Sequence, residues 1–312
     1  MFRRSLPILV ENMLTLFPKP HTLACARSQT HRFFPPSFFP NLQSRTTLLP
    51  SRDVAVVSGS SLEPEPLPPD LRPDLMPKNV AVIMDGNRRW AEMRGLPESA
   101  GHEAGIQSMR RIIDLCCSWG IKVLTLFWFS SDNWNRPKVE VNFLMRLFES
   151  TINTLFQKLK GIKISVTGDT LKLPTSLQRM ISNTEEKTKQ NGGMQLMAAI
   201  SYSGKYDVVQ ACKTIAGKVK DGIMEVEDIN EGLIEQELEA SCAKFPNPDL
   251  MIRTSGELKV SNFLLWQLAY TELGFDAHLW PDFGKDQFVE ALSLFQQRHR
   301  RFLWWKTTIL II

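Results

Sequence analysis

Several common sequence features are missing from this chain of 312 residues, and each absence excludes a class of protein. The five cysteines are scattered and odd in number, so they match neither a zinc-binding spacing nor a disulfide framework. No apolar run reaches the roughly 18 residues that a membrane-spanning helix needs. The glycine fingerprint of dinucleotide-binding folds and the P-loop lysine motif are both absent. These absences argue against a disulfide-rich secreted protein, an integral membrane protein and a nucleotide-dependent enzyme.

Acidic residues are almost missing from residues 1–52, where Glu11 stands against seven lysines and arginines. This segment is rich in Arg, Ser, Thr, Pro and Phe, a composition typical of an organelle transit peptide, and the absence of an obvious basic amphipathic helix favours a plastid. Residues 53–74 have no helical or strand period and are predicted to be a linker. The rest of the chain carries 30 basic and 32 acidic residues without a basic stripe, so we expect no nucleic-acid partner.

A buried strand predicted over Asn79 to Met84 runs directly into Asp85-Gly86-Asn87, which are turn and N-cap residues that open a helix. A helix N-terminus offers free N–H groups and the positive end of a dipole, which together attract anions. Arg88 and Arg89 lie in the first helical turn, where the dipole disfavours cations unless they bind an anion. From these residues alone, a capped helix with solvent-facing arginines remains an equal alternative.

A second predicted strand, Asp249 to Arg253, also ends in polar residues. Arg253, Lys259 and Ser261 lie around a glycine and precede an apolar segment, Asn262 to Glu272, that is expected to be a helix. Two cations and hydroxyl groups at such a position suit a diphosphate.

Apolar strands alternate with helical stretches along the chain from residue 75 to 312. This alternation predicts an α/β fold, a single domain whose mostly parallel central sheet is flanked by helices, preceded by a disordered N-terminal extension. Ligands bind at the carboxyl ends of such strands. The expected strands are Asn79 to Met84, Val123 to Phe129, Lys163 to Thr167, Met194 to Ser201, Asp249 to Arg253 and Phe275 to Trp280. The expected helices are Gly101 to Trp119, Val139 to Lys160, Leu173 to Gln190, Lys205 to Lys220 and Asn230 to Lys244.

Four motifs in this order resemble those of the cis-prenyltransferases, the family of undecaprenyl diphosphate synthase. They are Met84 to Trp90, Gly101 to Gly105, Phe129 to Pro137 and Asp249 to Glu272, within roughly residues 77 to 302. Trans-type prenyltransferases hold magnesium with paired aspartates, and this chain contains no Asp-Asp pair. The resemblance implies a magnesium-dependent enzyme that joins an allylic diphosphate to isopentenyl diphosphate, acts as a homodimer and, given the leader, works in the plastid stroma.

The resemblance also implies roles for individual residues. Asp85 would orient Mg²⁺ on the allylic diphosphate, and Glu272 would be a second carboxylate near the metal and the neighbouring subunit. Ser130 and Asn133 would assist the proton step, and Glu140 would hold the closed loop. The remaining expected substrate contacts are Gly86, Asn87, Arg88, Arg89, Trp90, His102, Trp134, Arg136, Arg253, Lys259 and Ser261.

Trp128 departs from the family pattern in the most informative way. Long-chain members have alanine at this position, on the strand that lines the product tunnel. Because protein interiors have no slack for an indole, Trp128 is predicted to stop elongation early, at about ten carbons. Strand alternation leaves open that Trp128 faces the other side of the sheet. Glu98 stands where bacterial enzymes carry an arginine that contacts the allylic diphosphate.

Several alternatives remain open at this level. The product could be neryl diphosphate or, by irregular coupling, lavandulyl diphosphate, and a long-chain polyprenyl diphosphate synthase is a further reading. A non-catalytic accessory subunit is disfavoured because the motif residues are retained. The apolar tail, Phe302 to Ile312, could contact a membrane surface, pack on the domain or fray.

Overall fold

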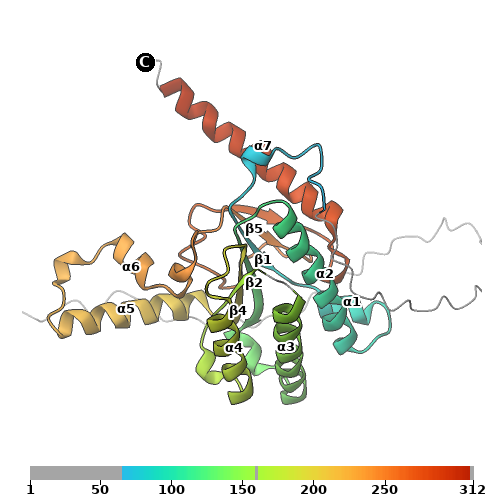
Figure 1. Cartoon of the computed structure of the whole chain (residues 1–312), viewed down its shortest axis with the longest axis horizontal. Coiled ribbons are helices and arrows are strands. Elements are labelled where there is room, and N and C mark those ends of the chain that lie inside the picture. The colour runs from blue at the N-terminus through green and yellow to red at the C-terminus, as the bar shows by residue number, and fades with distance from the viewer. Residues whose placement is uncertain (1–64, 159–160, 310–312) are drawn as a thin grey trace, which may run out of the picture. The chain divides into compact units, whose positions relative to one another are not determined.

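A parallel six-stranded sheet forms the centre of the computed structural model, which describes residues 65–158 and 161–309 (Figure 1). The strands lie in the order β3-β4-β2-β1-β5-β6, and every neighbouring pair is parallel. Their bounds are β1 (Asn79–Ile83), β2 (Val123–Ser130), β3 (Lys163–Thr167), β4 (Gln195–Tyr202), β5 (Leu250–Arg253) and β6 (Glu272–Phe275). The predicted α/β architecture is confirmed.

Helices cover both faces of this sheet, because nearly every residue of β1, β4 and β5 is buried and both faces need an apolar layer. The α-helices are α1 (Asn87–Glu92), α2 (Glu98–Ser118), α3 (Lys138–Lys158), α4 (Thr175–Thr188), α5 (Gly204–Lys220), α6 (Glu231–Glu237) and α7 (Lys285–Ile309). Short 3₁₀ helices are η1 (Pro73–Leu75), η2 (Ser131–Asn135), η3 (Thr170–Lys172), η4 (Val226–Asp228), η5 (Glu239–Cys242) and η6 (Trp280–Asp282).

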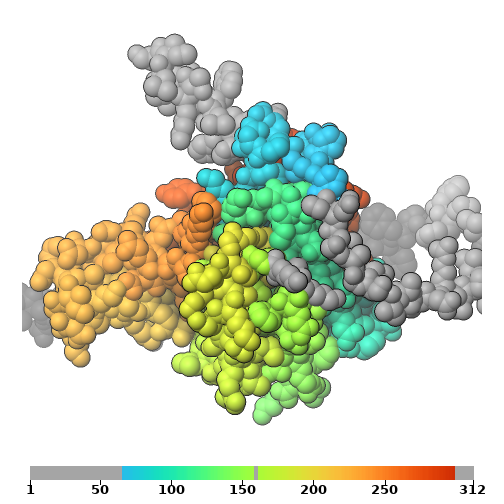
Figure 2. Space-filling model, viewed as in Figure 1, coloured from blue at the N-terminus to red at the C-terminus, as the bar shows by residue number. Residues whose placement is uncertain are grey.

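Alternate strand residues separate the core into two layers. Val80, Val82 and Leu126 pack with buried residues of α2 and α7, whereas Ala81 and Met251 pack with the segment that contains Phe263. A further cluster joins α3 and α4 to β4 and to the end of β2. In Figure 2 the segment of α5 and α6, coloured orange, forms a lobe at the left of the view. None of the described helices is long and apolar enough to cross a membrane.

Three predicted elements differ from the structure. The stretch expected to be one helix over Asn230 to Lys244 is divided into α6 and η5, with Leu238 in extended conformation between them. The last strand is β6, which ends at Phe275 where the predicted strand begins. The apolar segment after Ser261 forms turns instead of a helix, because Ser261, Asn262 and Leu264 have positive φ angles of 46°, 60° and 45°.

The domain begins earlier than predicted. Leu71 is only 3% exposed and belongs to the main core cluster, and the Trp119 indole N–H donates to the carbonyl oxygen of Glu65 at 3.2 Å. The amide of Gln296 clamps the backbone of Arg72 through two hydrogen bonds of 3.0 Å. Residues 65–74 are therefore part of the folded domain and not linker. The predicted transit peptide and residues 53–64 lie outside the described residues.

Candidate active site

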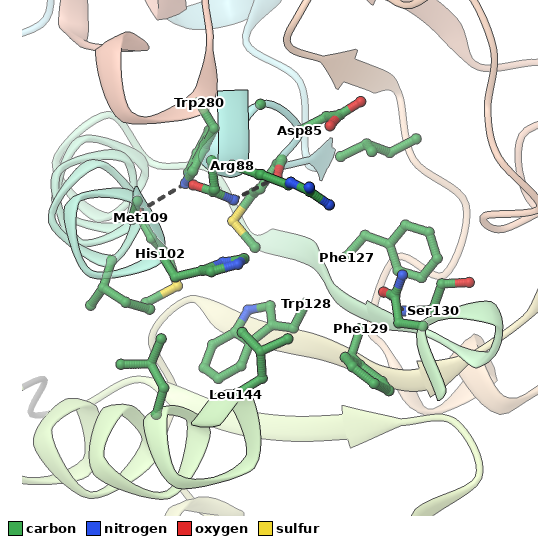
Figure 3. A pocket seen from close by; sticks show the side chains of 18 of the residues that line it. Asp85, Arg88, His102, Met109, Phe127, Trp128, Phe129, Ser130, Leu144 and Trp280 are labelled. Atoms are coloured by element: carbon green, nitrogen blue, oxygen red, sulfur yellow. Dashed lines mark hydrogen bonds between the residues drawn. The ribbon is translucent and has the colours of Figure 1, made fainter. Parts of the chain in front are cut away.

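A cavity of about 410 Å³ opens where β1, β2 and β5 end, between α2 and α3 (Figure 3). Polar side chains surround its mouth, and apolar side chains form its inner part. The polar lining is Asp85, Asn87, Arg88, Arg89, His102, Ser130, Asn133, Arg136, Arg253 and Ser261. The apolar lining includes Met84, Ile106, Met109, Phe127, Trp128, Phe129, Leu144, Leu147 and Phe148.

Asp85 lies two residues beyond β1 and is fixed by β5. The Arg253 guanidinium donates to its carboxylate at 2.8 Å, and a second arginine, Arg89, lies 3.9 Å away. The Thr254 hydroxyl accepts from the Asp85 N–H at 3.0 Å and donates to its carbonyl oxygen at 2.7 Å. Burial raises the pKa of this carboxyl. The hydrogen bond and charge of Arg253, with the charge of Arg89, lower it by more, so the net pKa lies below the usual value. Asp85 is therefore an ionised carboxylate at neutral pH.

Arg253 is a buried cation in the cavity lining. Its side chain is only 6% exposed, and one terminal nitrogen donates to the Ser261 hydroxyl at 2.5 Å and to the Lys259 carbonyl oxygen at 2.7 Å. Its buried Nε has no hydrogen-bond partner. A buried guanidinium with unused donor capacity next to a cavity is a strong binding group for phosphate oxygens.

The short helix α1 sits at the cavity mouth because α2 lets it approach closely. A Cβ on Gly101 would meet the Asn87 backbone carbonyl oxygen at 2.0 Å, so only glycine permits this packing. Gly86, with a φ of 110°, is the N-cap of α1. Arg88 is ion-paired through its Nε with Glu92 at 2.9 Å and with Glu98 at 3.0 Å. The acid at position 98 thus serves as a partner for Arg88.

Two residues of the cavity lining, His102 and Trp128, each carry a buried polar atom without a partner. In the view of Figure 3, the indole of Trp128 stands between the ring of His102 and Leu144. The His102 Nε2 and the Trp128 indole N–H are both buried without a hydrogen-bond partner. Burial, followed by the nearby charge of Arg136, lowers the pKa of His102 to about 4 against a smaller raising effect of Glu140. His102 is therefore a neutral imidazole at physiological pH.

Trp128 lies on the face of β2 that Leu124 and Leu126 share, as strand alternation requires, and it packs against their cluster. The pairing of β2 with β4 is irregular here: Phe127 pairs with Ala199, Phe129 with Ile200 and Ser130 with Tyr202, so an extra residue of β2 is followed by one of β4. The indole packs against the Phe148 ring at a centroid distance of 5.4 Å. The structure thus places Trp128 in the cavity wall, on the side that the sequence analysis favoured.

The segment after β2 is an ordered loop. The Asn133 amide oxygen accepts from the Ser130 N–H at 2.9 Å, and the Ser130 hydroxyl accepts from the Asp132 N–H at 3.1 Å. Arg136 and Glu140 form an ion pair of 2.5 Å. The Trp134 indole donates to the Ser201 hydroxyl at 2.9 Å and does not line the cavity. Trp134 therefore attaches this loop to β4.

Three other predicted site residues also lie outside the cavity lining, namely Trp90, Lys259 and Glu272. Trp90 donates to Asp282 at 2.7 Å and stacks under Arg94 at 4.2 Å, which joins α1 to η6. The exposed Lys259 ammonium pairs with Glu257 at 3.0 Å.

Glu272 is not at the cavity within one chain. It begins β6 opposite Leu250, at the amino end of the sheet, and its carboxylate pairs with Arg298 at 3.2 Å. Because Asp85 follows the carboxyl end of β1, these two carboxylates do not share a site within this chain.

The sequence analysis missed residues that complete the site. Thr254 and Trp280 hold the backbone of Asp85, and Trp280 donates its backbone N–H to the Asp85 carbonyl oxygen at 2.9 Å. Nothing in the local pattern indicates these long-range bonds. The apolar spacing of Leu144, Leu147 and Phe148 on α3 does signal an inward face, but not that this face lines a cavity.

The arrangement suits a ligand with an anionic head and an apolar tail. Arginines and a helix N-terminus lie at the mouth, and a buried apolar wall lies behind them. The sequence contains no nucleotide-binding loop motif. Among the described residues, there is no group of three His, Cys, Asp or Glu side chains that could hold a metal ion.

Comparisons with known proteins agree with this geometry. Residues 83–303 match the family model described as putative undecaprenyl diphosphate synthase. The chain is 61% identical to cis-prenyltransferase 4, chloroplastic, of Solanum lycopersicum over 80% of this chain and 81% of that protein. It is 56% identical to dehydrodolichyl diphosphate synthase 2 of Arabidopsis thaliana over 86% and 87%. The crystal structure of lavandulyl diphosphate synthase from Lavandula x intermedia in complex with dimethylallyl diphosphate is 41% identical, with a TM-score of 0.69 over 72% of this chain and 96% of that one.

Proposed function

Because the chain belongs to the cis-prenyltransferase family and is a cis-prenyl diphosphate synthase, we propose that it joins two five-carbon diphosphates into a ten-carbon product. The substrates are dimethylallyl and isopentenyl diphosphate, and the product is neryl or lavandulyl diphosphate for terpenoid biosynthesis. The observation that carries the short product is Trp128, whose indole occupies the cavity wall behind the polar mouth.

The allylic diphosphate would bind at the first turn of α1. Arg88 and Arg89 line the cavity there, and the helix N-terminus adds N–H donors of Gly86 and Asn87. Breaking the allylic C–O bond releases diphosphate, whose negative charge these groups stabilise. His102 lines the same cavity, so its neutral ring would contact the substrate without adding charge.

Isopentenyl diphosphate would bind at Arg253, Ser261 and Lys259. Its alkene attacks the allylic carbon, a C–C bond forms, and one proton leaves the new cation. Ser130, Asn133 and Arg136 lie on the ordered loop at the cavity mouth, and we assign to this loop closure over the substrates and assistance to the proton step. The Arg136–Glu140 ion pair would hold the loop in that position.

Magnesium is the cofactor implied by the family, and the donor set fits it. Mg²⁺ is commonly held by one or two carboxylates together with substrate phosphates and waters. Asp85 supplies one ionised carboxylate at the cavity mouth, beside the arginines assigned to the diphosphates. When bound, the ion would neutralise diphosphate charge and favour departure of the leaving group. A contribution from Glu272 would require a second copy of the chain.

A homodimer in the plastid stroma completes the proposal. Tyr270 is fully exposed, and Leu265 and Phe275 are 38% and 39% exposed near the edge strand β6. These apolar side chains suit a subunit interface in the 261–279 region. Sedimentation should therefore show a dimer, and a fully active monomer would contradict it.

The similar chloroplastic relative supports the plastid location, and a fusion of residues 1–64 to a fluorescent reporter tests it.

Product identity tests the function directly. Residues 65–312 are incubated with Mg²⁺ and labelled dimethylallyl and isopentenyl diphosphates, together and with dimethylallyl diphosphate alone, and the product alcohols are identified. Nerol from the mixture indicates head-to-tail coupling, and lavandulol from dimethylallyl diphosphate alone indicates irregular coupling. Long polyprenols would instead support the alternative, a long-chain synthase like the relative named for dehydrodolichyl diphosphate.

A further inference from the structure

The segment that follows Lys259 adopts a backbone conformation that L-residues rarely use. Ser261, Asn262 and Leu264 all have φ angles between 45° and 60°, and none is glycine. Such left-handed conformations are unfavourable for residues with a Cβ and persist only where the surroundings enforce them. The contacts of this segment should therefore show what holds it.

Asn262 is attached to the start of α5 through three hydrogen bonds. Its side-chain oxygen accepts from the Lys205 N–H at 2.9 Å, and its amide group donates to the Ser203 hydroxyl at 2.7 Å. Its backbone carbonyl oxygen accepts from the Gly204 N–H at 2.7 Å. The first N–H groups of a helix have no partner within the helix, so the Asn262 oxygens accept hydrogen bonds that the first turn of α5 would otherwise lack.

Gly204 supports the same contact from the other side. A Cβ at this position would meet the Leu265 N–H nitrogen at 2.9 Å and the Asn262 carbonyl oxygen at 3.2 Å. The two backbones are therefore in direct contact, which only glycine permits. Phe263 and Leu264 are buried beside it, and the Phe263 ring stacks on Phe127 at 4.5 Å.

Residue 261, next to this anchor, is part of the anion-binding element. The Ser261 hydroxyl accepts from Arg253 at 2.5 Å, and Arg253 in turn donates to Asp85 at 2.8 Å. A shift of the segment would move Ser261 and change the orientation of the guanidinium. We infer that Asn262 is a positioning residue for isopentenyl diphosphate, which rests on the proposed function: its bonds to α5 fix the Ser261 and Arg253 side chains.

Three variants of the full-length chain separate this role from general stability. Asn262→Gly keeps the left-handed backbone without strain but removes both side-chain bonds. Asn262→Asp keeps an acceptor for Lys205 and can accept from the Ser203 hydroxyl. Asn230→Ala is the matched control, because Asn230 caps α6 through a 3.0 Å bond from the Leu233 N–H and lies outside the cavity lining.

Steady-state kinetics and melting temperatures are measured for each protein. We expect Asn262→Gly to raise the KM for isopentenyl diphosphate about tenfold, as the loss of one or two hydrogen bonds implies. The KM for dimethylallyl diphosphate should change by less than about twofold, and Asn262→Asp should recover most of the loss. Asn230→Ala should lower the melting temperature, because the N-cap of α6 is lost, and leave both KM values unchanged.

The inference is overturned if Asn262→Gly leaves the KM for isopentenyl diphosphate unchanged. It is equally overturned if both KM values rise together or if the aspartate variant is no better than glycine. Failure of the proposed function gives a different result, because the wild-type protein would then bind no isopentenyl diphosphate in calorimetry.

Discussion

Replacing Trp128 by alanine should lengthen the product, because the indole fills space that a growing prenyl chain would use. The substitution removes roughly nine non-hydrogen atoms from the cavity wall, and one isoprenoid unit adds about five carbons, so one further unit would fit in the space released. No anchor of Asp85 or Arg253 is removed, so turnover should persist. We expect products of fifteen carbons or longer in place of ten.

The stability cost of this change should be modest. Truncating a fully buried tryptophan to alanine costs about 3–5 kcal/mol. Trp128 is only half-buried and lines a cavity, and its indole N–H is buried without a partner, which itself costs about 1–3 kcal/mol. Losing that unsatisfied group offsets part of the lost packing. The net loss in the free energy of unfolding should be about 1–3 kcal/mol.

Product chromatography after phosphatase treatment, with a denaturant unfolding curve on the same protein, tests this reasoning. Trp119→Leu is the control, because Trp119 is 6% exposed, stacks on Phe288 at 5.8 Å and lies outside the cavity lining. It should lose stability without changing the product. An unaltered ten-carbon product from destabilised Trp128→Ala, or long polyprenols from the wild type, would refute the steric account.

Three further predictions concern the cavity mouth and the domain boundary. Asp85→Asn should remain folded by circular dichroism and lose on the order of two or more decades of turnover, and unchanged turnover would exclude a metal-positioning role. Between pH 6.5 and pH 5 an unfolded histidine takes up a proton, whereas folded His102, with a pKa of about 4, does not. The free energy of unfolding should therefore fall by about 2 kcal/mol more in the wild type than in His102→Gln over this range. If urea unfolding shows the same pH dependence in both proteins, the lowered pKa is contradicted. Deleting residues 1–64 should leave the melting curve unchanged. Deleting residues 1–76 should lower the free energy of unfolding by about 2–5 kcal/mol, because the buried Leu71 side chain is lost from the core. Equal stability of the two deletion proteins would show that residues 65–76 do not contribute.

Much of the fold could be predicted because its signals are local. Continuous apolar runs such as Val80 to Ile83 identify strands that are buried on both faces, and alternation with helices implies a parallel sheet. Such a sheet brings the ends of its strands to one edge, which is why Asp85, Ser130 and Arg253 line a single cavity. The mouth of the site could thus be expected from the sequence.

Features that depend on long-range contacts could not be predicted in this way. The segment that begins at Asn262 has an apolar composition suited to a helix, but its contact with α5 imposes left-handed angles that end any helix there. Leu71 is flanked by Leu67 and Leu75, but the prolines between them exclude a regular helix, so no periodic element signals its burial. Trp90 and Trp134 belong to motifs of the site, yet each uses its indole N–H to join two elements.

The end of β2 supplies both polar and apolar side chains to the cavity. In a regular strand, side chains alternate strictly between the two faces of the sheet. Trp128 keeps this alternation with Leu124 and Leu126, whereas Phe129, where the pairing with β4 is irregular, packs in the cluster of α3 and α4. Because the cavity lies at the end of the strand, residues 127–130 all line it. Trp128 is thus separate in space from the groups that hold Asp85 and Arg253. Under the proposed function, we therefore expect a substitution at this position to change product length without altering how the diphosphates are held.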